Sequence, residues 1–225
     1  GFFHKMGLQE AQAIRWDSPY NYQENTLLYL PPEIPDPRDS SFPFVLADTI
    51  KNVTRASRGR AFCLFTSHAM MERVYKLVAG ELEWPSSKQG EAAKHHLLEK
   101  FLETENSVLF GTTSFWEGVD VQGESLSCVI IDKLPFAAPS DPVLKSQLKQ
   151  CEERGGIPFM DIQLPDAVIA LKQGAGRLIR SETDTGVLVI CDSRIVTKSY
   201  GRLFLDSLPG MPITANFADV EQFFR

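Results

Sequence analysis

Short apolar runs alternate with longer segments of helical period along most of the chain, and this alternation restricts the fold more than any other feature. The apolar runs are NTLLYLP (25–31), RAFCLFTS (60–67), NSVLFGTT (106–113), SLSCVIIDKL (125–134) and TGVLVICD (185–192). The segments of helical period, each 13 or more residues long, are 45–57, 68–82, 89–104, 140–154 and 165–181. Continuous apolar strands are buried on both faces, and strands that alternate with helices join through right-handed crossovers. We therefore predict one α/β domain, with a mostly parallel β-sheet and helices on both faces.

Composition excludes several classes of protein. The chain has 225 residues, 43% of them hydrophobic, which is enough to fill a substantial core. Its formal net charge of −6 gives no overall positive field, so any contact with nucleic acid must be local. No apolar run approaches the roughly 20 residues of a membrane span, and nothing resembles a signal peptide. These features favour a cytoplasmic protein with no membrane partner.

The cysteines are spaced too widely for a metal site. They form no C-x-x-C pair, and no histidine lies at ligand spacing from them, so we predict no bound metal in this chain. Three of the four lie in the apolar runs, where buried free thiols are expected. The four are Cys63, Cys128, Cys151 and Cys191.

Proline content suggests how the chain is divided. The stretch YLPPEIPDPRDSSFP (29–43) predicts an extended loop that leads into the domain. We therefore expect an extended leading segment at 1–44 that packs on the domain, the main domain at 45–214, and a C-terminal tail at 215–225. The sequence starts at Gly1 in mid-pattern without an initiator Met, so we also expect it to be a piece of a longer chain.

The stretch LKQGAGRLIRSETDTG (171–186) predicts a polar face on a helix that contains two glycines. At about 100° per residue, Gln173, Arg177 and Arg180 fall together opposite an apolar stripe. Glycine in a helix interior costs about 1 kcal/mol relative to alanine, so Gly174 and Gly176 are expected to make room for a ligand or another backbone. Guanidinium groups and an amide on one face suit a polyphosphate. A solvated helix face with cations near its C-terminal end remains the alternative.

Two further groups of polar residues follow predicted strands. In open α/β sheets, ligands bind beyond the carboxyl ends of the strands, and hydroxyl groups there can hold a phosphate without reading sequence. The alternatives are Ser67 as a helix N-cap, Asp120 as a cap in a polar turn, and Trp116 as a core residue. The first group is Thr66 and Ser67, and the second is Thr112, Thr113, Trp116, Glu117, Gly118 and Asp120.

The chain end, ANFADVEQFFR (215–225), has apolar residues at helical or near-helical spacing. They are Phe217, Val220, Phe223 and Phe224. On a free tail they would form an exposed patch, which often marks a partner site. The alternative is that the tail docks on the sheet of its own domain.

The polar stretches together resemble a known family. FTS with its following helix, TTSFWEGVDV and QGAGRLIR resemble the fourth, fifth and sixth motifs of the C-terminal RecA-like domain of superfamily 2 DNA helicases. QGAGRLIR has the sixth-motif pattern Q-x-x-G-R-x-x-R, and VIIDKLPFAAPSDP (129–142) is similar to the XPD/DinG iron–sulfur branch. The resemblance implies a RecA-like fold for nearly the whole chain.

In this family ATP binds between two RecA-like domains, and the second domain contributes the sixth motif. The resemblance implies that Gln173 and Arg177 contact the γ-phosphate side and that Arg180 is the arginine finger. The residues implied to lie near the nucleotide are Glu117, Gly118, Asp120 and Gly176. The residues implied to contact single-stranded DNA are Thr66, Ser67, Thr112, Thr113, Trp116, Arg194, Lys198 and Tyr200, with core packing as the alternative for Tyr200.

The resemblance also implies parts that this sequence lacks. ATP and Mg²⁺ would be bound mainly by the first domain, and the 4Fe–4S cluster would belong to the full-length protein, with none in this chain. We therefore expect this piece alone to be inactive. The full-length protein is expected to be a 5′-to-3′ DNA helicase in replication and repair, nucleoid-associated in a bacterial cytoplasm. Expected partners are single-stranded DNA, the first RecA-like domain and, for the tail, the χ subunit of DNA polymerase III. The alternative is a replisome interaction module that binds χ without catalysis.

Overall fold

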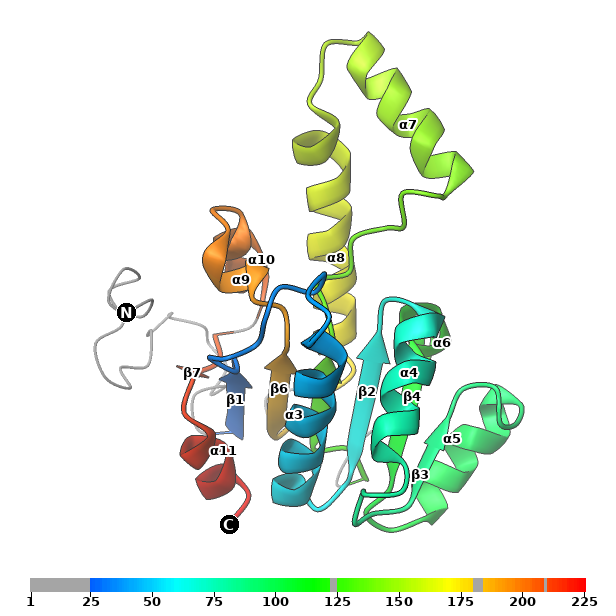
Figure 1. Ribbon diagram of the computed structural model, residues 1–225, viewed down its shortest axis with the longest axis vertical. Helices are drawn as coiled ribbons and strands as arrows, with labels where there is room; N and C mark the ends of the chain where they lie inside the picture. Colours follow the sequence, from blue (N-terminus) through cyan, green and yellow to red (C-terminus); the bar gives the residue numbers. More distant parts are fainter. Residues whose placement is uncertain (1–24, 122–124, 180–183, 209) are drawn as a thin grey trace.

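The computed structural model describes residues 25–121, 125–179, 184–208 and 210–225. Seven strands form one sheet in the order β3-β4-β2-β5-β6-β1-β7, and every neighbouring pair is parallel (Figure 1). The strands are β1 (Thr26–Tyr29), β2 (Ala61–Phe65), β3 (Ser86–Lys88), β4 (Val108–Thr112), β5 (Cys128–Ile131), β6 (Gly186–Ile190) and β7 (Ile213–Thr214). The five predicted strands are confirmed. The edge strands β3 and β7 were not predicted, because they have only three and two residues and lack a continuous apolar run.

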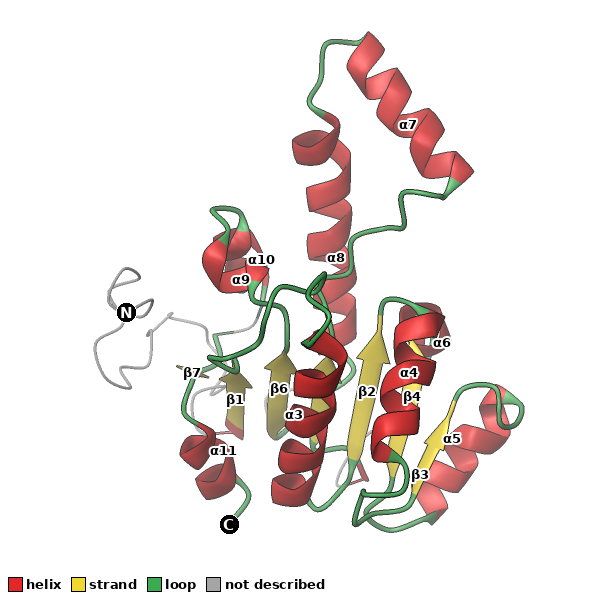
Figure 2. Cartoon of the chain, viewed as in Figure 1, coloured by secondary structure: helices red, strands yellow, loops and turns green. Residues whose placement is uncertain are grey.

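Helices cover both faces of the sheet, as predicted (Figure 2). One face carries α3 (Phe42–Ser57), α4 (His68–Val78) and α11 (Phe217–Phe223). The other carries α5 (Lys94–Glu103), α6 (Thr113–Trp116), α8 (Leu164–Ala175), α9 (Arg194–Thr197) and α10 (Gly201–Ser207). Alternate strand residues divide between the two cores: in β5, Ile130 packs with α3 and Ile131 packs with α8.

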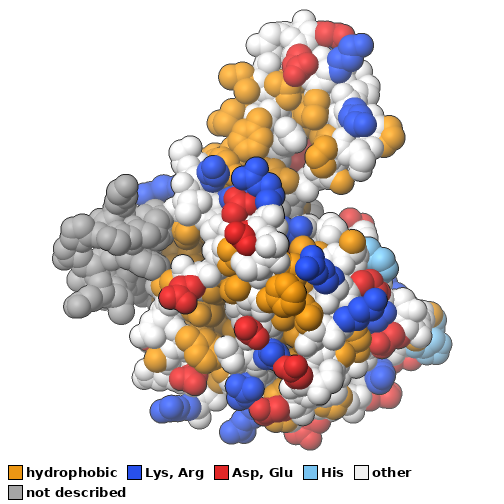
Figure 3. Space-filling view, viewed as in Figure 1, with side chains coloured by type: hydrophobic (Ala, Val, Ile, Leu, Met, Phe, Trp, Pro, Cys, Tyr) orange, Lys and Arg blue, Asp and Glu red, His pale blue; other side chains and the backbone are white. Residues whose placement is uncertain are grey.

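A helical arm projects beyond the carboxyl ends of the strands (Figure 1). It consists of α7 (Pro142–Glu153), the π-helical turn η2 (Phe159–Gln163) and the first part of α8. Asp141 caps α7 by accepting hydrogen bonds from the backbone N–H groups of Val143 and Leu144. Apolar side chains are visible on the arm in Figure 3, and Ile157 and Met160 are 62% and 49% exposed.

The predicted boundaries at 44/45 and 214/215 do not separate folded units. Strand β1 lies inside the sheet between β6 and β7, with Leu28 paired to Leu188 on one side and to Ile213 on the other. Helix α11 packs on α3 and β1 through Val220, which is fully buried. The segment 215–225 therefore belongs to the domain rather than forming a free tail, because its apolar residues complete the core under α3.

Candidate functional site

The polar groups predicted from the sequence gather at the carboxyl edge of the sheet. Thr66 follows β2 directly and Thr112 ends β4, and these two strands are neighbours. The Thr113 hydroxyl donates a hydrogen bond to the backbone oxygen of Phe65, 3.3 Å away. The fourth- and fifth-motif residues thus form one continuous patch across β2 and β4.

Local hydrogen bonds fix this patch. Ser67 caps α4 by accepting a hydrogen bond from the Met70 backbone N–H, at 3.2 Å, so the N-cap interpretation describes its side chain. The backbone N–H and the hydroxyl of Thr112 both donate to Oε1 of Gln89, at 2.8 and 2.9 Å. Gln89 was missed by sequence reasoning because it follows β3, a strand too short to predict.

Trp116 is a core residue, which corrects the expectation that it packs beside DNA. Its side chain is 2% exposed, stacks on Phe62 with ring centroids 4.0 Å apart, and donates from Nε1 to the Gly111 backbone oxygen. A side chain enclosed on all sides cannot stack on a base.

A Cβ at Gly111 would lie 2.6 Å from the ring of Phe115, so glycine is needed there to let α6 fold back on β4.

The loop after α6 meets the sixth-motif stretch. Nη1 of Arg177 donates a hydrogen bond to the Val119 backbone oxygen at 2.7 Å. Glu117 and Asp120 are exposed on this loop, and Gly118 adopts a left-handed conformation with φ of +71°. The structure therefore brings together Arg177 and the loop that carries the predicted nucleotide contacts, although 58 residues separate them in sequence.

The helix itself is shorter than predicted. It ends at Ala175, with Gly176 as C-cap, so Gln173 is exposed on the last turn of α8 whereas Arg177 lies beyond the helix. Gly174 faces the sheet, where an added Cβ would make ordinary contacts with Leu64 and Ile131, at 3.4 and 3.7 Å. The expectation that this glycine makes room for a ligand or another backbone is wrong, because its neighbours are core side chains. Arg180 lies outside the described residues.

The three residues after β6 that the resemblance implies to contact DNA differ in their exposure. Lys198 is exposed. Arg194 instead forms an ion pair with buried Asp192, with Nη2 2.6 Å from Oδ2, and lies over the Phe136 ring. Tyr200 packs in an aromatic cluster with Phe136, as its core-packing alternative proposed. Of these three residues, Lys198 is therefore the one whose charge lies at the surface.

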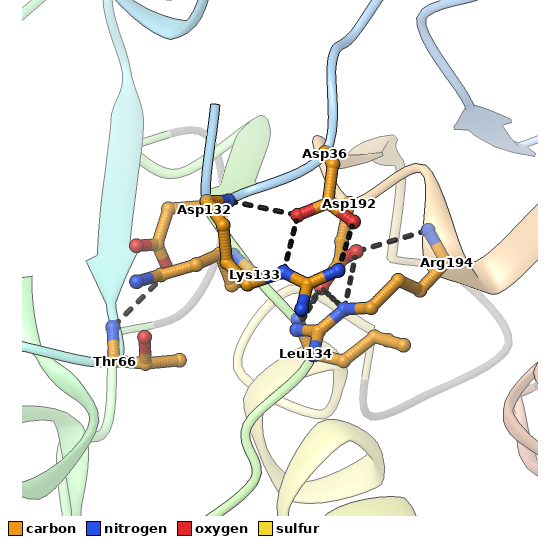
Figure 4. Close-up of polar contacts among 8 residues, drawn as sticks. Asp36, Thr66, Asp132, Lys133, Leu134, Asp192 and Arg194 are labelled. Carbon is orange, nitrogen blue, oxygen red and sulfur yellow. Dashed lines mark hydrogen bonds and ion pairs between the residues drawn. The ribbon is translucent and has the colours of Figure 1, made fainter. Parts of the chain in front are cut away.

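Two buried carboxyl groups at this edge were not singled out from the sequence (Figure 4). Asp132 follows β5 and Asp192 follows β6, and each is 1% exposed. Asp132 Oδ1 accepts from the backbone N–H groups of Thr66 and Lys133, at 3.1 and 2.7 Å. Asp192 Oδ2 accepts from the Leu134 N–H at 2.8 Å. The signal was present: VIID and VICD both end an apolar run on an aspartate.

Burial perturbs Asp132 strongly. It raises the pKa of the carboxyl from its ordinary 3.8 to about 7, against the opposing effects of Lys133 and the two N–H donors. Its second oxygen, Oδ2, has no hydrogen-bond partner among the described residues. A buried carboxyl with one unpartnered oxygen lowers the stability of the fold, and its hydrogen bonds to two backbone N–H groups offset part of that loss.

Other classes of site are not found in the described ranges. Within residues 25–121, 125–179, 184–208 and 210–225, no three His, Cys, Asp or Glu side chains come together as ligands for a metal ion. In the same ranges, no helix has the length and apolar character needed to cross a bilayer. All four cysteines are free thiols, and Cys63, Cys128 and Cys191 are buried as predicted.

The parallel sheet and the contacts at its carboxyl edge define the class as a RecA-like α/β domain. The chain superposes on the solved structure named XPD_Helicase with a TM-score of 0.66 at 16% identity, over 84% of this chain and 36% of that one. At that identity the match shows the fold, and it confirms the predicted architecture.

Sequence relatives define the family more closely. Residues 50–211 match the helicase C-terminal domain family, and the chain belongs to it. It is 45% identical over 222 residues to ATP-dependent DNA helicase YoaA of Escherichia coli strain K12, covering 99% of this chain and 35% of the relative. It is 37% identical over 209 residues to ATP-dependent helicase DinG of Mycobacterium tuberculosis strain H37Rv, covering 92% and 32%. The chain thus spans about a third of the length of these relatives, and the resemblance to the XPD/DinG branch is confirmed.

Proposed function

We propose that this chain is the second motor domain of an ATP-dependent DNA helicase. The observation that carries the proposal is the hydrogen bond from Arg177 to Val119, which joins the sixth-motif stretch to the loop of Glu117, Gly118 and Asp120. The guanidinium thus contacts a loop that carries two exposed carboxylates and a glycine in the left-handed conformation, at the edge of a RecA-like sheet where ligands bind.

The residues of this edge suit the γ-phosphate side of ATP. A guanidinium has five N–H donors. One donates to the Val119 backbone oxygen, and the others would contact phosphate oxygens. Gln173, exposed on the last turn of α8, would orient a phosphate or water, and Gly176, the C-cap of that helix, would lie near the nucleotide. Arg180 would stabilise the charge that develops during phosphoryl transfer. Mg²⁺, held mainly by the first motor domain, would neutralise phosphate charge.

The patch across β2 and β4 would hold single-stranded DNA by its backbone. The hydroxyls of Thr66 and Ser67 would contact a phosphate there, since such groups bind phosphate without reading sequence. Thr112 and Thr113 would complete the track while their hydroxyls hold Gln89 and the Phe65 backbone oxygen. Lys198 would add one exposed charge. The chain's net charge of −6 supports a local contact rather than a broad basic surface.

The whole protein would move along DNA in the 5′-to-3′ direction during replication and repair, in a bacterial cytoplasm and near the nucleoid. Its first motor domain would supply the phosphate loop, most of the ATP and Mg²⁺ site and the 4Fe–4S cluster. This chain alone would hydrolyse no ATP, because it would hold only one side of the nucleotide cleft.

A test of the arginine finger uses the full-length protein. Arg180→Ala should lower DNA-stimulated ATP hydrolysis by about 10³- to 10⁵-fold, because the transition-state charge loses its partner. Arg154→Ala, on the exposed arm, is the matched control and should leave the rate unchanged. Wild-type hydrolysis by Arg180→Ala would refute the assignment.

The second candidate, binding of the polymerase III χ subunit, is favoured by one surface. A groove of about 360 Å³ beside α11 is lined by Phe217 and Phe224 together with Arg55, Arg58 and Arg225. Of the four apolar tail residues, Phe217 and Phe224 line this groove, Val220 is buried in the core, and Phe223 is not part of the groove lining.

Point substitutions test this second candidate better than removing the tail, which would open the core. Phe224→Ala should weaken capture of χ by at least about tenfold if this groove is the partner site. Exposed Leu102→Ala, on α5, is the control. Unchanged χ binding in Phe224→Ala would contradict the proposal.

A further inference from the structure

Asp132 lies where three strand ends meet. Strand β5 pairs with β2 on one side and with β6 on the other, and Asp132 is the first residue after β5. Its side chain turns toward β2 rather than toward solvent, since Oδ1 reaches the Thr66 backbone N–H at 3.1 Å (Figure 4). This bond joins residues 66 positions apart in the sequence.

The bond ties down the loop between β2 and α4. On the β4 side, the Thr113 hydroxyl holds the backbone oxygen of Phe65. On the β5 side, Asp132 holds the backbone N–H of the next residue, Thr66. The peptide that joins β2 to α4 is therefore held from both neighbouring strands, immediately before Ser67 caps the helix.

Burying the Asp132 carboxyl is unfavourable, which indicates that its hydrogen bond to the β2–α4 loop has a function. Asp132 is 1% exposed and its Oδ2 has no partner among the described residues. An apolar residue would fill the same position without that penalty, since buried polar groups destabilise unless they are hydrogen-bonded. What an apolar residue could not do is accept the Thr66 N–H.

We propose that Asp132 is a positioning residue of the DNA track, whose carboxyl fixes the β2–α4 loop so that Thr66 and Ser67 bind a phosphate of single-stranded DNA. The inference rests on the proposed function, because it assigns the geometry of the same patch. Asp132 itself, buried behind the loop, touches no ligand. Its neighbour Asp192 performs the parallel task on the other side of β5, where Oδ2 accepts from Leu134.

The test measures DNA binding and loop exchange in the full-length protein. Asp132→Ala removes the acceptor, whereas Asp132→Asn keeps a carbonyl oxygen for the Thr66 N–H. Ser127→Ala is the matched control, because Ser127 is also buried, lies at the opposite end of β5, and has a hydroxyl without a partner among the described residues. Affinity is measured by fluorescence anisotropy with labelled oligothymidylate, and loop order by hydrogen–deuterium exchange of a peptide spanning 64–70.

The expected results distinguish a residue that positions the loop from one with another role. Asp132→Ala should bind the oligonucleotide about tenfold more weakly, since one hydrogen bond to a loop is lost, and its 64–70 peptide should exchange faster. Asp132→Asn should recover both to within about twofold. Ser127→Ala should match the wild type in both measurements. If Asp132→Ala does not fold by circular dichroism, Asp132→Val, which suits a strand and has no acceptor atom, replaces it with the same expectation.

Two results would overturn the inference. One is wild-type affinity in Asp132→Ala or its replacement. The other is an equal loss in Asp132→Ala and Asp132→Asn, because the second variant keeps the acceptor. Absence of oligonucleotide binding by the wild type would instead refute the proposed DNA track itself, so the two failures are distinguishable.

Discussion

Asp132 shows how strongly one residue depends on its environment. As an aspartate in a polar loop it would be ionised at neutral pH and would report little about the fold. Its burial at the end of β5 raises the pKa to about 7 instead. The charged and titratable groups that act on it are Lys133 on its own segment and Cys191 and Asp192 directly after β6, while the neutral Thr66 lies directly after β2.

This pKa predicts a pH-dependent stability. Between pH 3.8 and about 7 the folded protein retains the Asp132 proton whereas the unfolded chain releases it, so the free energy of unfolding falls as pH rises through this window. Above about pH 7 both states are ionised and the contribution is constant. Asp132→Asn should therefore gain stability relative to the wild type, by on the order of 1 to 4 kcal/mol, between pH 5 and pH 8.

The measurement is urea unfolding of wild type and Asp132→Asn at a series of pH values. Asp166→Asn, exposed in the first turn of α8, is the control and should run parallel to the wild type. A constant difference between Asp132→Asn and the wild type across this range would show that Asp132 is already ionised at low pH in the folded state.

Gly111 is a second single residue whose identity is required, because its position has no room for a side chain. A Cβ there would meet the Phe115 ring at 2.6 Å and Trp116 at 3.2 Å, and both rings are packed in the core. Gly111→Ala should destabilise the protein by about 1 to 3 kcal/mol through overpacking. Gly80→Ala meets nothing within 4 Å and should be close to neutral. Thermal unfolding compares the two, and equal midpoints would show that α6 can shift without cost.

At the scale of elements, helix α11 is the one whose role the sequence left most open. Its apolar spacing fits either an exposed partner surface or internal docking, and periodicity alone cannot separate them. Asn216 caps the helix by accepting from the Ala218 N–H, and Val220 fills the space between α3 and β1. Internal docking therefore accounts for Val220, while Phe217 and Phe224 line the groove beside it.

Val220→Ala tests this docking. Removing two buried methyl groups should cost about 1 to 3 kcal/mol of unfolding free energy, because Val220 is fully buried. Glu221→Ala, on the exposed side of the same helix, should change stability by less than about 0.5 kcal/mol. Chemical denaturation of both variants gives the comparison, and equal stabilities would mean that α11 detaches in solution.

At the scale of the whole molecule, the domain begins before the family match. The match covers 50–211, yet β1 at Thr26–Tyr29 lies between β6 and β7. Removing β1 would expose the apolar edge of β6 and leave β7 without the strand that holds it.

A fragment of residues 45–214 should therefore fail to unfold cooperatively, whereas residues 25–225 should show one transition. Circular dichroism during heating, with dye binding to detect exposed apolar surface, distinguishes the two fragments. A cooperative transition at the same temperature in both would restore the boundaries predicted from the proline-rich stretch.

Sequence by itself determined the α/β class, the five central strands and the order of the polar patches along the chain. Those features follow from local periodicity and from the rule that parallel strands present their carboxyl ends at one edge. It did not determine β3 or β7, because strands of two or three residues are stabilised by neighbours rather than by their own composition. The length of α8 was also overestimated, since the apolar spacing continues to Leu178 although the helix ends at Ala175.

Tertiary structure alone decided which polar residues act together. Arg177 meets Val119 and Asp132 meets Thr66 across separations of 58 and 66 residues, and no local pattern encodes such pairs. It also decided burial: Trp116 and Val220 lie in the core, although their sequence context fits an exposed role equally well. The physical reason is that periodicity defines an apolar face, whereas the packing of distant segments decides what covers that face.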